Sequence, residues 1–96
     1  MRVVVDSNVK ILGVFEPPTE LELPHPAPTL KELLKELSRR CRTLELLSAD
    51  GNDLGFDLEK VIVSGTECVL PRDLDRPLKD GDRVFVRVLI APLGGG

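Results

Sequence analysis

Residues 82–91, DRVFVRVLIA, form the most strand-like run of this 96-residue chain. β-Branched side chains occupy every second position of the run, a spacing that places them together on one face of a strand. They are Val84, Val86, Val88 and Ile90. The opposite face carries Phe85, Arg87 and Leu89. The run therefore predicts a late strand whose β-branched face lies in the core, beneath another element.

A helix that begins after Thr29 is the expected cover for that face. Thr29 followed by Glu32 has the spacing of a capping box, which marks a helix N-terminus. Apolar residues then recur at helical spacing on one side, and charged residues occupy the other side. The apolar stripe consists of Leu30, Leu33, Leu34, Leu37 and Cys41. An amphipathic helix of this kind packs against one face of a sheet.

Shorter β-rich runs on both sides of the helix predict the remaining strands. Before the helix, the candidates are Arg2–Asp6, Val9–Phe15 and Glu20–Leu23, and the pattern leaves open which of them pair. After it, Val61–Val63 and Glu67–Leu70 predict a hairpin around a tight turn. This order predicts an α+β fold of the β-grasp (ubiquitin-like) type. In that fold a mixed four- to five-stranded sheet carries one main helix on one face, and its first and last strands lie side by side.

The composition excludes several classes of function. The net charge is −3, whereas a nucleic-acid-binding protein would carry a basic stripe. No apolar run is long enough to span a membrane, and no secretory signal is expected at the N-terminus. Cys41 and Cys68 are too few for a disulfide framework or a zinc site, and they suit a reducing, cytoplasmic location. The length fits one domain, which we expect to occupy residues 1–90.

The sequence also lacks the motifs of a self-contained enzyme. It has no P-loop, no GxSxG elbow and no CxxC pair. His25 is the one histidine and lies between prolines in an expected loop, so no metal site or histidine-based triad is predicted. Cys41 and Cys68 fall in apolar segments, where packing accounts for them. We therefore expect no catalytic activity from this chain alone.

The remaining feature is the run Gly94–Gly96, directly after the strand-like segment. Residues 91–96 form an expected flexible tail that can reach about 20 Å from the sheet. Pro92 would stiffen its base, Leu93 would supply an apolar anchor, and the glycines would permit close backbone approach. The carboxylate of Gly96 is unhindered but must be activated, usually by adenylation, before sulfur or an amine can attack it. An inert tail is the alternative.

Several pieces of this sequence resemble the ThiS/MoaD family of sulfur carrier proteins. The C-terminal pieces are VIVSG at 61–65, VLPR at 69–72, PLKDGDRV at 77–84 and the terminal glycines. The start of the family's helix is similar to TLKELL at 29–34. The LKDGD turn by itself is only moderately specific for the family. The resemblance is strong when a last strand and a C-terminal Gly-Gly follow this turn.

The resemblance implies a carrier, or co-substrate, rather than an enzyme. An E1-like adenylyltransferase of the ThiF/MoeB kind would adenylate the Gly96 carboxylate, which would then become a thiocarboxylate. Thiazole synthase or the large subunit of molybdopterin synthase would receive the sulfur, for thiamin or molybdopterin biosynthesis. In the second case the chain would be the small subunit of molybdopterin synthase. ATP, magnesium and zinc would belong to the activating partner, and this chain would bind no cofactor or metal.

Two aspects of function stay open at this point. Segments Leu12–Thr19 and Ser48–Glu59 make the chain longer than a typical ThiS, and this length favours MoaD. Pro71-Arg72 and the three glycines favour ThiS instead. A ubiquitin-like modifier would use the same activated carboxylate and differ only in its nucleophile, a substrate lysine. For either role we expect Phe85, Arg87 and Leu89 to form a partner-docking face, with Pro92–Gly95 recognised as the tail.

Overall fold

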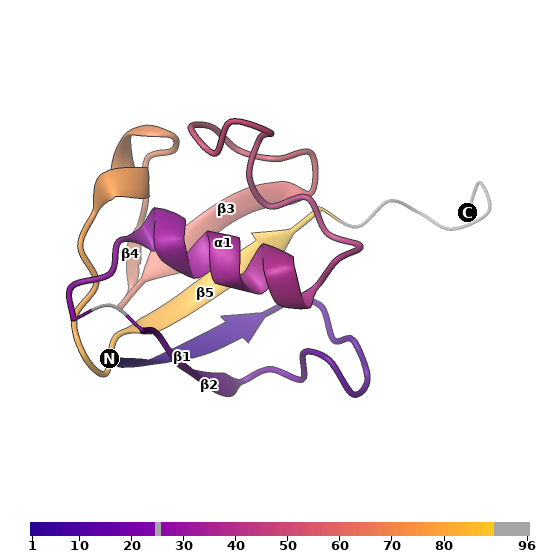
Figure 1. Cartoon of the computed structure of the whole chain (residues 1–96), viewed down its shortest axis with the longest axis horizontal. Helices are drawn as coiled ribbons and strands as arrows, with labels where there is room; N and C mark the ends of the chain where they lie inside the picture. The colour runs from indigo at the N-terminus through magenta and orange to yellow at the C-terminus, as the bar shows by residue number, and fades with distance from the viewer. Residues whose placement is uncertain (25, 90–96) are drawn as a thin grey trace.

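The computed structural model describes residues 1–24 and 26–89, which contain five strands and one α-helix (Figure 1). The elements are β1 (Arg2–Ser7), β2 (Thr19–Glu22), α1 (Leu30–Arg40), β3 (Leu58–Val63), β4 (Thr66–Glu67), the short 3₁₀ helix η1 (Arg72–Asp75) and β5 (Arg83–Val88). The predicted α+β class with a mixed sheet of four to five strands is confirmed, and the sheet has five.

The strands lie in the order β2-β1-β5-β3-β4, so the first and last strands are neighbours at the centre. β1 and β5 are parallel, and the β1–β2, β3–β5 and β3–β4 pairs are antiparallel. In Figure 1, α1 crosses one face of the sheet diagonally and leaves the other face without a covering helix. The exposed face and the ends of the strands are therefore the surfaces on which a site can form.

The helix has the ends that its sequence predicts. The Thr29 hydroxyl accepts a hydrogen bond from the Glu32 backbone N–H at 3.4 Å and lies as far from Glu32 Oε1. At the other end, Arg39 and Arg40 both bond the Glu36 carboxylate. Cationic side chains in the last turn complement the negative end of the helix dipole.

The core lies between α1 and the inner face of the sheet. The predicted helix stripe is buried, and so are the inward residues of β1 and β5. These residues are Leu30, Leu33, Leu34, Leu37, Cys41, Val3, Val5, Val84, Val86 and Val88. The expected core role of Cys68 is also confirmed, because that thiol is buried. Ile90, the fourth β-branched residue of the last strand, lies outside the described residues.

Two predicted strands differ in the structure. Val9–Phe15 is a loop in which Ile11 and Phe15 form an isolated bridge, so β1 pairs with the third candidate run instead. The run 67–70 was expected as a return strand, but β4 is limited to Thr66–Glu67. The predicted tight turn is present: Ser64 and Gly65 both have positive φ, as a two-residue hairpin of this twist requires. Within the described residues, no helix is long and apolar enough to cross a membrane.

Candidate functional site

The C-terminal end of β5 is held from both sides. On the β1 side, the Asn8 side chain donates to the Val88 carbonyl at 2.9 Å and accepts from the Val88 N–H at 2.8 Å. On the β3 side, the Leu89 N–H donates to the Asp57 carbonyl at 2.7 Å. Neighbouring amides of an extended chain point to opposite edges of the strand. Asn8 therefore accepts from the Val88 N–H on one edge, and Asp57 accepts from the Leu89 N–H on the other. The backbone at the end of β5 is therefore held as far as Leu89.

The segment that bonds Leu89 is itself tied to the preceding loop. Asp57 N–H donates to the Glu45 carbonyl at 2.9 Å, and the Asp57 carboxylate accepts from the Glu45 N–H at 2.7 Å. Gly55 N–H donates to the Leu46 carbonyl at 3.0 Å. A Cβ at Gly55 would lie 2.3 Å from the Glu45 carbonyl oxygen, so this close approach requires glycine. The pairing gives the long α1–β3 loop a rigid end beside β5.

The uncovered sheet face has an apolar centre. Val4, Ile62 and Phe85 come from the three central strands, are half-buried, and line a shallow depression of about 230 Å³. Phe85 lies opposite Ile62 on β3 and Asp6 on β1. A half-buried aromatic residue amid smaller apolar side chains is a composition typical of protein interfaces.

Charged side chains surround this apolar centre. Arg2 lies within 3.6 Å of both Glu20 and Glu22, across the β1–β2 pair. On the opposite side, Arg87 pairs with Glu59, and Lys60 lies 3.7 Å from Glu67. These exposed pairs contribute little to stability, because solvent screens them. They form a polar rim that suits recognition of a protein partner.

The residues expected to form a docking face lie along β5 and directly after it, and none of the three is buried. Phe85 and Arg87 lie on the uncovered face of the sheet, with Phe85 at its apolar centre and Arg87 in its rim. Leu89 is half exposed, at 50%, and lies beyond the end of β5, where it bonds Asp57. Their role in docking stays a prediction. Pro92, Leu93, Gly94, Gly95 and Gly96, together with His25, lie outside the described residues.

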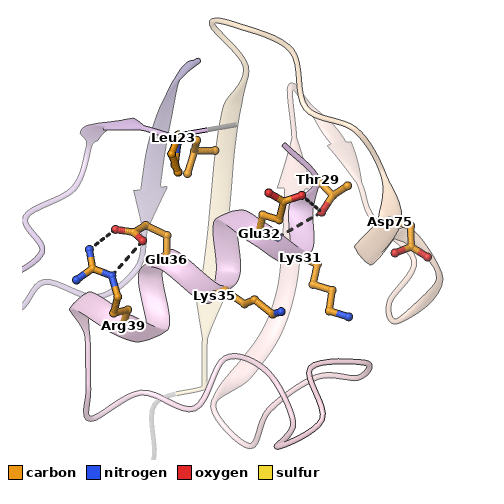
Figure 2. Close-up of a pocket in the computed structure, with 9 residues that line it drawn as sticks. Leu23, Thr29, Lys31, Glu32, Lys35, Glu36, Arg39 and Asp75 are labelled. Carbon is orange, nitrogen blue, oxygen red and sulfur yellow. Dashed lines mark hydrogen bonds and ion pairs between the residues drawn. The ribbon is translucent and has the colours of Figure 1, made fainter. Parts of the chain in front are cut away.

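A second hollow, of about 640 Å³, runs beside α1 (Figure 2). In Figure 2 the Glu36 and Arg39 side chains point toward one another, and Lys31 and Lys35 extend on another side of the helix. The bonds from Arg39 and Arg40 hold the pKa of Glu36 below its usual range, so it stays ionised at neutral pH. Ligand pockets are mostly apolar, whereas side chains of both charge signs line this hollow. It has the character of a solvated helix face.

The thiols are poorly suited to chemistry. Both Cys41 and Cys68 are buried, and burial raises the pKa of each thiol. The thiolate is the nucleophilic form, so neither residue is primed to attack or to carry sulfur. Among residues 1–24 and 26–89, no group of three or more His, Cys, Asp or Glu could hold a metal ion.

No protein-family model matches the sequence, and no curated protein matches it. Two solved structures resemble it over nearly its whole length. A Pyrococcus furiosus protein, provisionally assigned as molybdopterin converting factor, subunit 1, is 22% identical and has a TM-score of 0.60, over 93% of this chain and 98% of its own. The Haloferax volcanii HVO 2177 protein, a solution structure, is 21% identical with a TM-score of 0.67, over 95% of this chain and 85% of its own. The protein has the β-grasp fold.

At about one-fifth identity, the likeness to these two solved structures concerns the fold alone. They support the resemblance to ThiS/MoaD proteins at the level of the fold. The strand order is the arrangement that the sequence predicts, with β1 and β5 side by side at the centre of the sheet.

Three residues at the end of β5 were not singled out by the sequence. Asn8 stands in an expected turn, and nothing in its neighbours indicates a bond to a residue 80 positions away. Asp57 and Phe56 lie in the Ser48–Glu59 segment, which was noted from the sequence only for the length that it adds. The available signal was Gly55-Phe56: an aromatic residue after a glycine, inside a polar loop.

Proposed function

We propose that this protein is a sulfur carrier of the ThiS/MoaD type that acts through the carboxylate of Gly96. An E1-like enzyme transfers AMP from ATP to this carboxylate and releases pyrophosphate. A sulfide-level sulfur nucleophile then displaces AMP, so that the C-terminus becomes a thiocarboxylate. A second enzyme then takes the sulfur. The protein is a co-substrate in this scheme and contributes no catalytic group of its own.

The observation that carries the proposal is the position of β5. This strand lies in the middle of the sheet, bonds both β1 and β3, and has its last amides fixed by Asn8 and Asp57. The seven residues that follow Leu89 end in three glycines. Small side chains let a polypeptide enter a narrow active site, and a rigid base fixes where it enters.

The state of the cysteines supports carriage on the carboxylate. A persulfide carrier needs an accessible cysteine with a lowered pKa, whereas Cys41 and Cys68 are both buried with raised pKa values. The other group that could carry sulfur, according to the resemblance, is the carboxylate of Gly96.

The Pyrococcus furiosus neighbour favours molybdopterin over thiazole as the destination of the sulfur. The receiving enzyme would then be the large subunit of a molybdopterin synthase, and this chain its small subunit. The activating partner would be a MoeB-like E1 enzyme. ATP with magnesium, and a structural zinc, would belong to that enzyme.

Intact-mass spectrometry of the chain purified from its own organism tests the proposal. We expect a species whose mass increase corresponds to the exchange of one oxygen for sulfur, localised by fragmentation to Gly96. A chain that lacks Gly95 and Gly96 is the matched control, and it should show no such species.

Two results would contradict the proposal. An isopeptide between Gly96 and lysines of other proteins, without any thiocarboxylate, would identify a ubiquitin-like modifier instead. If cells that carry only the shortened chain keep normal molybdopterin and thiamin levels, the tail serves neither pathway.

A further inference from the structure

Phe56 is an exposed aromatic side chain on a fixed backbone. Its side chain is 82% exposed. The residues on either side are held, because Gly55 N–H bonds the Leu46 carbonyl and Asp57 bonds Glu45 through both its backbone and its carboxylate. A large apolar side chain in water gains nothing for the fold, and a rigid base means that little backbone freedom is lost when it binds.

Phe56 is close in sequence to the residue that bonds the end of β5. The next residue, Asp57, accepts the hydrogen bond from the Leu89 N–H, so Phe56 is one residue from the point where the chain leaves the sheet. Leu89 itself is 50% exposed. Phe56 and Leu89, called the exit patch below, are exposed apolar residues next to the hydrogen bond that joins Asp57 to Leu89.

The length of the tail determines how close an activating enzyme must come. Seven residues follow Leu89, and fully extended they span at most about 25 Å. An enzyme that encloses the last glycines and ATP in its active site uses much of that length. Its outer surface then lies against the end of β5, where the exit patch is located.

We propose that the exit patch is a docking surface for the enzyme that activates the Gly96 carboxylate, with Phe56 as the anchor that enters an apolar socket beside the tail entrance. This inference rests on the proposed function. It adds a contact from the Ser48–Glu59 segment, which makes the chain longer than a typical ThiS. Aromatic side chains supply large contact area with few rotatable bonds and dominate binding at many interfaces.

Kinetics of ATP–pyrophosphate exchange test the proposal, with the full chain and the purified E1-like enzyme of the same organism. For Phe56→Ser we expect the KM for the chain to rise about 10- to 30-fold, with kcat unchanged. The melting temperature should stay within error of the wild-type value, because the side chain is exposed. Val69→Ser is the matched control: Val69 is also an exposed loop residue, at 54%, but it follows β4, the edge strand that β3 separates from β5. Its KM should not change.

Three results would overturn the inference, and they are distinguishable. An unchanged KM for Phe56→Ser, while the wild-type chain is activated normally, removes the docking role and leaves the proposed function intact. Sedimentation showing that Phe56 mediates self-association, lost in the variant, assigns the patch to a second copy of the chain. Absence of any exchange with the wild-type chain contradicts the proposed function itself, and this inference with it.

Discussion

Asn8 shows how one side chain can extend a sheet. Its amide presents one donor and one acceptor, and these pair with the carbonyl and the N–H of Val88 as a neighbouring strand would. Ser7 adds a bond from its hydroxyl to the Val86 carbonyl at 2.7 Å. The β1 edge of β5 therefore stays paired beyond the last register pair of the two strands, Ser7 with Val86.

Replacement of Asn8 by alanine should release one amide and spare its neighbour. The Val88 N–H loses its acceptor, and a net loss of about 1 kcal/mol predicts about fivefold faster exchange with solvent. The Leu89 N–H keeps its bond to Asp57 and serves as an internal control. Amide hydrogen exchange followed by NMR measures both rates in one sample. Equal acceleration of the two amides would show that Asn8 acts on global stability and does not fix the end of the strand.

At the scale of elements, the loop between α1 and β3 owes its shape to Gly55. The Cβ of an alanine there would lie 2.3 Å from the Glu45 carbonyl oxygen and 2.7 Å from the Leu47 nitrogen. Both neighbours are backbone atoms, so no side-chain rotation can relieve the overlap. The bonds that hold Asp57, and through it Leu89, depend on this close approach.

We expect Gly55→Ala to lower the free energy of unfolding by about 3 kcal/mol, the upper range for overpacking. Gly13→Ala is the control: a Cβ there meets nothing within 4 Å, but φ is +76°, and that conformation costs an alanine about 1 to 2 kcal/mol. Urea unfolding measures both variants. A loss for Gly55→Ala no greater than that for Gly13→Ala would mean that the loop can relax, and that its fit is not what orders the end of β5.

The elements also show what the sequence could and could not predict. The helix and β5 were predictable because each has one strong period, with apolar residues at every third or fourth position in α1 and at every second position in β5. Val9–Phe15 has strand-like composition but forms a loop, since Phe15 packs into the core and Gly13 takes a positive φ. Local composition carries no information about such packing. The bonds of Asn8 and Asp57 to β5 are likewise non-local, so no pattern in the sequence predicts them.

At the scale of the whole molecule, two separate apolar surfaces can meet one partner. Phe85 lies on the uncovered sheet face, and the exit patch lies beyond the end of the same strand. Leu89 is four positions after Phe85, which is about 13 Å along an extended strand. An enzyme large enough to enclose the tail can cover both surfaces at once.

If one enzyme contacts both surfaces, their contributions to binding should add. Side chains that neither touch each other nor share a partner usually contribute independently. We expect Phe85→Ser to raise the KM for the chain about tenfold in ATP–pyrophosphate exchange, and the double variant with Phe56→Ser to show the product of the two single effects.

Phe85 is half-buried, so Phe85→Ser should also lower stability by about 1 to 2 kcal/mol. The assay therefore runs well below the melting temperature of the double variant, with Val69→Ser as the common control. A double variant no worse than Phe56→Ser alone would restrict the contact to the exit patch and would leave the sheet face available to the enzyme that accepts the sulfur.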